Sequence, residues 1–328
     1  MNLLVIGGTV FLGRALVDAA AARGHRVTLF NRGKTHPGLY PEVEQIHGDR
    51  ETDLSLLDGR TWDAVIDTCG YFPRIVRLSA RSLAARTGSY VFISSISVYA
   101  STARPGIDEQ EPVGKLEDET VEDIGGGAYG PLKALCEAAV TEEMGAARAL
   151  IVRPGLIVGP YDTSDRFTYW PWRFTQPGTV LAPGRPDRPL QLIDVRDLAE
   201  WTISAVEQGL SGPYNTNGPA GMCTMQDVIR SCQEETGSTN PVRWAGDDFL
   251  LGENVGMWME MPLWIPENEA DAPGFFSVST AKAMAAGLRS RPLHETVRAV
   301  LEWLPQRGER PWKAGLTMER ERELLAKL

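Results

Sequence analysis

Cysteine and histidine, the residues that most often bind metals or form disulfides, are scarce in this sequence. The 328 residues include four cysteines and four histidines. No two cysteines have the spacing of a CxxC motif, and no histidine lies near a cysteine at the spacing of metal ligands. We therefore expect reduced thiols without assigned chemistry and no bound metal.

Long apolar runs are also lacking. No run approaches the ~20 apolar residues that span a bilayer. Residues 1–6 lack the basic n-region and the long apolar stretch of a signal peptide. These absences predict no membrane association and a cytoplasmic location.

Basic residues are fewer than acidic residues. The chain has 33 Lys and Arg against 43 Asp and Glu, a formal net charge of −10. Such a charge repels polyanions, so we expect a small-molecule substrate and no nucleic-acid partner. The content of 43% hydrophobic and 23% charged residues is typical of a globular protein. The length favours one large lobe and one smaller lobe.

Short apolar runs alternate with segments of helical periodicity in the N-terminal half. Residues 3–6 and 27–30 are apolar runs, and residues 11–23 between them have apolar side chains at helical spacing. Further strands are predicted at residues 43–46, 62–67, 90–94 and 149–152, and further helices at residues 74–86 and 129–144. This alternation favours an α/β fold of Rossmann type, a doubly wound parallel sheet with helices on both faces.

A glycine turn connects the first strand to the first helix. Residues 7–13 read GGTVFLG. Glycine lets the backbone turn sharply and brings the amides at the helix start close to a pyrophosphate, so the turn predicts a dinucleotide site. Val10 stands where many such motifs have a middle glycine, which predicts a less close approach to the phosphates. The expected contacts are Gly7, Thr9, Val10, Phe11, Leu12 and Gly13.

The end of the second strand bears on the choice of dinucleotide. An acid there binds the ribose 2′-hydroxyl, whereas a cation accommodates a 2′-phosphate. The chain has Asn31 and Arg32 at this point and no acid. NADP is therefore favoured over NAD, with Lys34 as a second cation and a plain surface role for Arg32 as the alternative. Asp49, after the third strand, is expected to bind the adenine amino group or to form a turn.

Tyr129 and Lys133 lie four residues apart, so they share one face of a predicted helix. A tyrosine with a pKa near 10 is a poor acid or base at neutral pH, and a nearby ammonium stabilises the phenolate and lowers that pKa. Tyr129 is therefore a candidate general acid/base. Pro131 is tolerated only near a helix start, which puts the pair in the first turns.

A serine-rich segment ends the strand at residues 90–94. Residues 94–99 read SSISVY. Open parallel sheets place their ligand sites at the carboxyl ends of strands, where a hydroxyl can bind and orient a substrate carbonyl or alcohol. Serines in loops also form turns, which is the alternative.

The glycine turn, the serine-rich strand end and the Tyr/Lys helix occur in the order and spacing of the short-chain dehydrogenase/reductase superfamily. The chain resembles its extended, epimerase-like branch, the NAD-dependent epimerase/dehydratase family, over nearly its whole length. Residues 153–160 (RPGLIVGP) are similar to that branch's segment beside the nicotinamide, and residues 194–199 (DVRDLA) to its substrate-domain motif. The GGTVFLG turn followed by NRG resembles most an atypical subgroup, which includes reductase-like bacterial proteins and chloroplast stem-loop-binding proteins and tolerates Val10.

The resemblance implies roles for individual residues. Tyr129 would be the acid/base, Lys133 would bind the nicotinamide ribose and lower the tyrosine pKa, and Ser95 would orient the substrate. Ser97 could assist Ser95. The further cofactor contacts expected are Cys69, Gly70, Pro154, Gly155 and Ile157.

Residues 96–97 and Arg32 limit the types of reaction that the chain is expected to catalyse. Sugar-nucleotide dehydratases of the branch place an Asp-Glu pair after the catalytic hydroxyl residue, where this chain has Ile96 and Ser97. Dehydration is therefore disfavoured. Hydride transfer remains, as net carbonyl reduction or as epimerisation of a nucleotide sugar through a transient ketone. Arg32 favours the reductase, because a net reductase usually draws on NADPH whereas an epimerase recycles tightly held NAD.

The substrate contacts are the least defined part of the prediction. Arg166, Arg185 and Arg196 are candidate ligands of a phosphate or carboxylate, with surface or ion-pair roles as the alternative. Four tryptophans are candidates for an apolar pocket, with core positions as the alternative: Trp170, Trp172, Trp258 and Trp264.

Three questions about partners and the chain end stay open. A non-catalytic member that binds RNA or a partner protein is a remote alternative, which the intact Ser95, Tyr129 and Lys133 set and the acidic charge oppose. The alanine-rich residues 133–140 fit either a homodimer contact or burial inside the monomer. Residues 319–328 predict a charged terminal helix with a solvated face.

The composition divides the chain into two parts. Pro and Trp are dense between residues 160 and 189, and residues 246–273 are rich in Gly, Pro, Met and Trp. Such loop-rich segments commonly hold the small-molecule end of a site. We predict a dinucleotide-binding Rossmann domain over residues 1–153, to which some later segments return. Residues 154–328 are predicted to form mainly a substrate-binding lobe.

Overall fold

Seven strands form the central sheet of the computed structural model, which describes all 328 residues. Their order is β11-β6-β5-β4-β1-β2-β3, and every neighbouring pair is parallel. The strands are β1 (Asn2–Ile6), β2 (Arg26–Asn31), β3 (Glu44–His47), β4 (Trp62–Asp67), β5 (Thr87–Ile93), β6 (Ala149–Arg153) and β11 (Gly212–Asn215). This arrangement confirms the predicted doubly wound α/β fold of Rossmann type.

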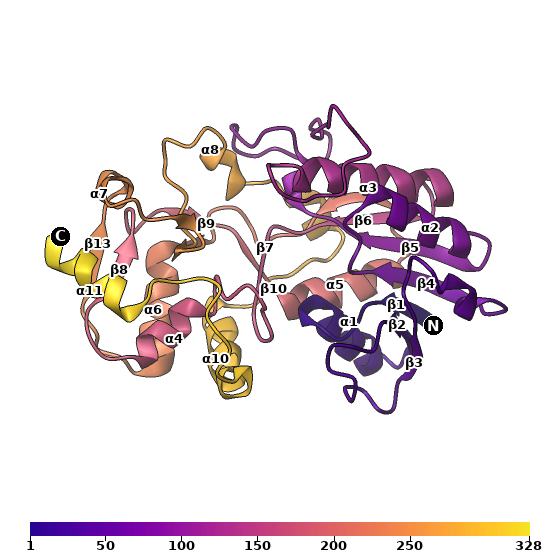
Figure 1. Cartoon of the computed structure of the whole chain (residues 1–328), viewed down its shortest axis with the longest axis horizontal. Helices are drawn as coiled ribbons and strands as arrows, with labels where there is room; N and C mark the ends of the chain where they lie inside the picture. The colour runs from indigo at the N-terminus through magenta and orange to yellow at the C-terminus, as the bar shows by residue number, and fades with distance from the viewer.

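Helices cover the sheet on both faces. Leu3, Leu4 and Val5 of β1 have no exposed surface, as expected for a strand between two helical layers. Helices α1 (Phe11–Ala22) and α5 (Val195–Glu207) pack together on one face, and α2 (Pro73–Leu83) and α3 (Tyr129–Met144) on the other (Figure 1). Inside the monomer, α3 buries the alanine-rich stretch, including Ala139 and Val140.

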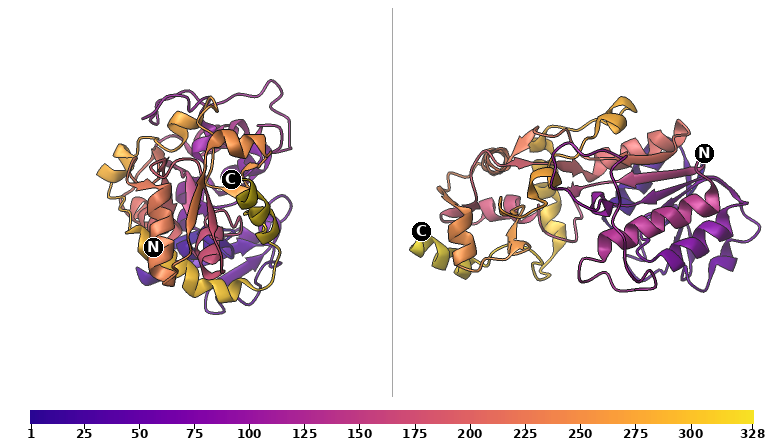
Figure 2. Two further views of the ribbon diagram at one scale, coloured as in Figure 1. Left: turned by 90° about the vertical axis from the view of Figure 1, so that its left-hand side faces the viewer. Right: turned by 90° about the horizontal axis from the view of Figure 1, so that it is seen from above.

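The rest of the chain builds a second lobe beside the sheet, with its own hydrophobic core. Figure 2 shows the two lobes side by side, with the N-terminus at one end of the molecule and the C-terminus at the other. The helices of this part are α4 (Tyr169–Thr175), α6 (Met225–Thr236), α7 (Asp247–Gly252), α8 (Ala272–Phe275), α10 (Leu293–Trp303) and α11 (Met318–Lys327). Helix α9 (Ala281–Ala285) returns to the first lobe, where it packs against β11 and the core beneath α5. The strands are β7 (Leu156–Val158), β8 (Val180–Pro183), β9 (Pro189–Leu190), β10 (Leu192–Asp194), β12 (Cys223–Thr224), β13 (Val242–Ala245), β14 (Met257–Trp258) and β15 (Met261–Pro262). None of the helices in the molecule is both long and apolar enough to cross a bilayer.

The terminal helix α11 corrects one prediction. Its surface was expected to be solvated, but Glu321 is 1% exposed. The Glu321 carboxylate accepts from Arg173 Nε at 2.7 Å and from the backbone N–H of Leu181 at 2.9 Å. A buried charge needs such partners, so one face of α11 is fixed against α4 and β8.

Candidate active site

A cavity of about 950 Å³ opens at the carboxyl ends of the central strands. It lies where the strand order reverses between β1 and β4, which is where open parallel sheets bind their ligands. Its wall includes residues that directly follow β1, β2, β3, β4, β5 and β6. All the residues predicted to bind the dinucleotide except Gly70 line it, as do Ser95, Ser97, Tyr129 and Lys133. Of the candidate substrate contacts, Arg166 and Trp258 line it, whereas Arg185, Arg196 and the other three tryptophans do not.

The glycine turn forms one end of the cavity. A Cβ on Gly13 would lie 2.8 Å from both the Cα and the N of Gly8, so only glycine lets α1 begin this close to the turn. The first turn of α1 has no acidic residue and no side-chain cap, so its backbone N–H groups are available to bind an anion. Val10 has an extended backbone (φ −132°) and lines the cavity with its side chain 39% exposed.

The two polar residues after β2 differ in their surroundings. Asn31 is tied to the turns on either side, because its Nδ2 donates to the Gly7 carbonyl at 3.3 Å and its Oδ1 accepts from the Gly33 N–H at 2.8 Å. Arg32 is exposed, lines the cavity and has no hydrogen bond or ion pair within the protein. Its guanidinium is therefore available to bind a ligand.

Asp49 lines the cavity and also forms a turn. Its Oδ1 accepts from the Glu51 N–H at 3.0 Å, and its own N–H donates to Asp53 Oδ2 at 2.7 Å. The turn-forming alternative is thus realised at this position.

Lys133 reaches the cavity from the first turns of α3. Its Nζ donates to the carbonyl oxygens of Gly70 and Ile93, both at 2.7 Å. Burial lowers the pKa of Lys133 to about 8. Gly70 therefore lies behind the cavity wall and holds the lysine, while its neighbour Cys69 lines the cavity.

Three hydroxyls meet on the wall beside Lys133. The Ser95 hydroxyl lies 3.1 Å from the Ser97 hydroxyl and accepts from the Ser97 N–H at 3.1 Å. Tyr129 lines the same wall and lies close enough to Ser95 for that hydroxyl to act on the pKa of the phenol. A Cβ on Gly130 would collide with the Ser97 carbonyl, so glycine is needed to bring the start of α3 against this strand end. The predicted catalytic hydroxyls and Tyr129 are therefore close together.

The electrostatics around Tyr129 differ from the expected ones. Burial raises the pKa of Tyr129, and the nearby Ser95 hydroxyl and the positive charge of Arg166 oppose that rise. The ammonium of Lys133 is held by two carbonyls instead. In the protein without cofactor, Arg166 therefore acts on Tyr129 in the direction that was expected of Lys133.

A buried ion pair fixes α3 to the sheet. The guanidinium of Arg153, at the end of β6, binds Glu137 of α3 with Nε–O and Nη2–O distances of 2.9 and 2.6 Å. Ser94 also donates to Glu137 at 2.6 Å. These contacts hold the helix that carries Tyr129 against the ends of β5 and β6.

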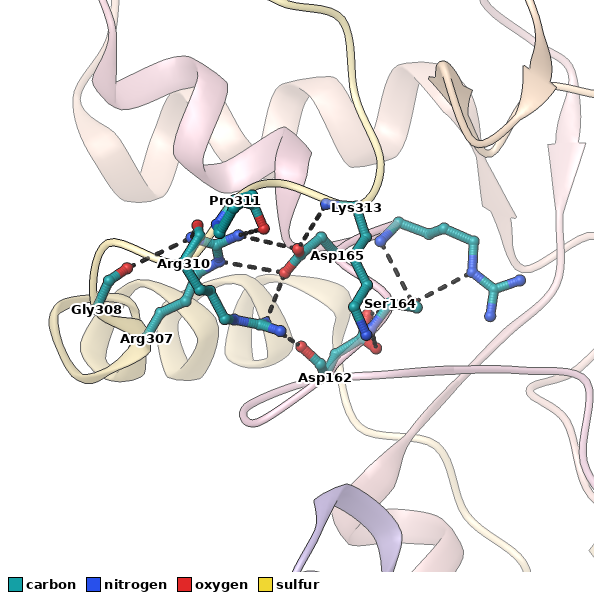
Figure 3. A network of polar contacts seen from close by, with 9 residues as sticks. Asp162, Ser164, Asp165, Arg307, Gly308, Arg310, Pro311 and Lys313 are labelled. Atoms are coloured by element: carbon teal, nitrogen blue, oxygen red, sulfur yellow. Dashed lines mark hydrogen bonds and ion pairs between the residues drawn. The ribbon is translucent and has the colours of Figure 1, made fainter. Parts of the chain in front are cut away.

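The loop after β7 supplies part of the far end of the cavity, where the sequence predicted only Arg166 and Trp258. Asp162, Thr163, Ser164 and Arg166 all line it, together with Trp258 and Phe275 from distant segments. Asp165 lies behind them with no exposed surface and accepts from Arg307, Arg310 and the Lys313 N–H (Figure 3). This network attaches the loop to the C-terminal part of the chain.

Several proposed substrate contacts lie elsewhere. The guanidinium of Arg196 is bound by Asp194 at 2.8 and 3.0 Å, outside the cavity wall, and Arg185 is exposed and paired with Asp187 and Glu267. Trp170 and Trp264 belong to the core of the second lobe, and Trp172 packs against it. The Asp194 carboxylate balances the charge of Arg196, which does not line the cavity.

Some lining residues had no signal in the sequence. Tyr71, Phe72 and Ile75 come from the segment after β4 and the start of α2. Arg50, which also lines the cavity, pairs with the fully buried Asp67 at 2.6 Å. No group of three or more His, Cys, Asp or Glu side chains is arranged to hold a metal ion.

No family model matches the chain. The epimerase family protein SDR39U1 of Bos taurus is 26% identical over 247 residues, which cover 70% of this chain and 79% of that protein. A crystal structure of UDP-glucose 4-epimerase superposes with a TM-score of 0.69 at 14% identity, covering 95% of this chain and 99% of that one. The UDP-glucuronic acid 4-epimerase of Bacillus cereus, in complex with NAD, gives a TM-score of 0.66 at 16% identity over 93% and 99%. The chain is thus similar in sequence to an epimerase family protein over most of its length, and it shares the fold of the two UDP-sugar 4-epimerase structures.

Proposed function

We propose that the protein is a nicotinamide-dependent oxidoreductase that reduces the carbonyl group of a small molecule, with Tyr129 as the proton donor. The observation that carries this proposal is the meeting of Tyr129, Ser95 and Lys133 in one cavity that also contains the glycine turn. In this proposal residues 1–153, with the returning α5 and β11, bind the dinucleotide. Most of residues 154–328 bind the substrate.

The residues of the cavity fit a dinucleotide. The uncapped start of α1 suits a pyrophosphate, since helix N-termini favour anions. The unpaired Arg32, with Lys34 beside it on the cavity wall, suits a 2′-phosphate, so we propose NADP as the cofactor and NAD as the alternative. The remaining contacts assigned to the dinucleotide are Asn31, Asp49, Cys69, Pro154, Gly155 and Ile157.

When bound, NADPH supplies a hydride to the carbonyl carbon. The residues of the chain orient the carbonyl and supply the proton. Ser95 donates a hydrogen bond that orients the carbonyl oxygen, and Tyr129 gives its proton to that oxygen. The raised pKa of Tyr129 keeps the phenol protonated before transfer, as a proton donor requires. Lys133 holds the neighbouring loop through Gly70 and is available to the nicotinamide ribose.

A nucleotide-sugar epimerase is the second candidate. The similarity to two UDP-sugar 4-epimerase structures favours it, and the same Tyr129 can serve both directions of hydride transfer. Arg32 favours the reductase, because a consumed cofactor is usually NADPH.

Titration of the purified protein with NADPH and NADH, followed by a panel of carbonyl compounds, tests the proposal. We expect NADPH to bind and its absorbance to fall with a suitable carbonyl. The Tyr129→Phe variant should bind NADPH equally and lose turnover by at least about 100-fold. Failure to bind either nucleotide, together with unchanged turnover of Tyr129→Phe, would refute the enzyme. Copurified NAD that is not consumed during turnover would favour the epimerase.

A further inference from the structure

Three arginines line the cavity, and they differ in what neutralises them. Arg50 is paired with Asp67, and Arg32 is exposed at the dinucleotide end. Arg166 is half-buried at the opposite end and has no carboxylate oxygen within 4.0 Å of its nitrogens. The only hydrogen bond of its side chain joins Nε to the Ser164 hydroxyl at 3.2 Å. Both of its terminal amino groups are therefore available.

The most deeply buried guanidinium groups of the molecule are paired. Each of them has a carboxylate within 2.9 Å; among them are Arg153, Arg173, Arg188, Arg291 and Arg307, whose side chains are at most 16% exposed. Burial without a contacting carboxylate disfavours a charge, and burial lowers the pKa of Arg166 below its ordinary value even though the negative charge of nearby Asp162 opposes that shift. An anion from outside the chain would supply the missing partner.

The position of Arg166 is preset by its loop. The adjacent Asp165 has a left-handed backbone (φ +63°) and is held by Arg307, Arg310 and the Lys313 N–H (Figure 3). Asp162 is held by the N–H and hydroxyl of Ser164 at 2.7 and 2.9 Å. A side chain on a fixed loop loses little conformational freedom when it binds a ligand.

The surroundings of Arg166 suit a small substrate next to the catalytic group. Its Cζ lies 5.0 Å from the centre of the Trp258 ring, and Phe275 packs edge-on against that ring at 5.3 Å between centres. The guanidinium is close enough to Tyr129 for its charge to act on the phenol. A ligand between Tyr129 and Trp258 would therefore lie beside the Arg166 cation and an aromatic wall, with the Asp162 carboxylate, whose oxygens accept from Ser164, also on the wall.

We propose that Arg166 binds an anionic oxygen group of the substrate, a carboxylate or a phosphate, while the carbonyl to be reduced faces Tyr129. The planar guanidinium offers two parallel N–H donors, which match the oxygens of such a group. Trp258 and Phe275 cover the apolar part of the same substrate. This inference rests on the proposed function and adds the class of substrate to it.

Calorimetric titration with matched pairs of carbonyl compounds tests the inference. Phenylglyoxylate is compared with its neutral methyl ester, and dihydroxyacetone phosphate with dihydroxyacetone. The protein is titrated both without cofactor and with NADP⁺, which cannot reduce the probes. In at least one pair we expect the anionic member to bind at least tenfold more tightly, equivalent to about 1.4 kcal/mol. The pair that shows the preference separates a carboxylate site from a phosphate site.

Variants assign the preference to one side chain. Arg166→Met should abolish it, and Arg166→Lys, which keeps the charge without the planar donors, should reduce it several-fold. The Lys variant keeps the test decisive if the Met variant does not fold. Arg185→Met is the matched control, because Arg185 is exposed and outside the cavity, and it should retain the preference.

Two results would overturn the inference: equal binding of both members of each pair by the wild type, or a full preference in the folded Arg166 variants. These titrations need no turnover. Loss of NADP⁺ binding would thus count against the proposed function, while anion binding would still be measured.

Discussion

Replacing Asp165 by Asn should destabilise the fold around the substrate end of the cavity. The Asp165 carboxylate has no exposed surface and accepts from Arg307 Nε and Nη2 at 3.2 and 2.9 Å. It also accepts from Arg310 Nη2 at 2.8 Å and from the Lys313 N–H at 3.1 Å. Asn has nearly the same volume, but it lacks the charge and turns an amino group towards these donors.

The expected loss follows from the burial of both partners. Arg307 has a side chain that is 4% exposed, so it would be left as a buried charge with its main partner gone. Breaking a buried ion pair in this way costs about 3–5 kcal/mol. For 328 residues the entropy of unfolding is about 0.7 kcal/mol/K, so the melting temperature should fall by about 4–7 °C.

Thermal unfolding followed by circular dichroism measures this change. Asp187→Asn is the matched control, because Asp187 pairs with Arg185 at 2.6 Å but its side chain is 72% exposed. The control should melt within about 1 °C of the wild type. A fall of less than 2 °C for Asp165→Asn would show that the network in Figure 3 does not stabilise the loop, and the preset position of Arg166 would lose its support.

Other predictions concern the cofactor end. Arg32→Ala should weaken NADPH binding about tenfold relative to NADH, because a charge-assisted contact to the 2′-phosphate is lost, and an unchanged affinity ratio would contradict the preference for NADP. Gly13→Ala should weaken dinucleotide binding and lower the melting temperature, because a Cβ there would lie 2.8 Å from the backbone of the glycine turn. Gly252→Ala, in open space on α7, should do neither, and equal effects of the two changes would refute the close-contact argument. Burial lowers the pKa of Lys133 to about 8, so the unfolded chain holds this proton more tightly between about pH 8 and 10.5. The stability of the wild type relative to Lys133→Met should therefore rise with pH across that window, and a constant difference in melting temperature would show that Lys133 is not buried as a charge.

The inner part of the sheet was predictable from local pattern. Residues 3–6 and 62–67 are mostly apolar, and they form β1 (Asn2–Ile6) and β4 (Trp62–Asp67). Continuous apolar runs of this length suit strands that are covered on both faces. The glycine turn was recognisable because it lies between such a run and a helical pattern, and the structure has it at the start of α1.

Elements that depend on distant partners were not predictable in this way. The edge strand β11 reads GPYN, with residues that strands disfavour, and it forms by pairing with β6. The burial of Glu321 depends on Arg173, which is 148 residues away. A local charge pattern cannot reveal such a pair.

The residues of the candidate site likewise differ in whether a local sequence pattern indicates them. Ser95, Tyr129 and Lys133 could be selected because each follows a recognisable strand end or helix start. Asp162 and Phe275 could not, since they reach the cavity from separate segments, the loop after β7 and the end of helix α8. The pairing of Arg196 with Asp194, two residues away, and its position outside the cavity wall were not evident from the sequence either.

Equilibrium titration of the purified protein with NADPH and NADH tests the central claim most directly. The cavity at the ends of the central strands predicts one site per chain that binds NADPH, with a lower affinity for NADH because Arg32 then has no 2′-phosphate to meet. Binding of neither nucleotide would contradict the assignment of this cavity to a dinucleotide, and with it the proposed reaction.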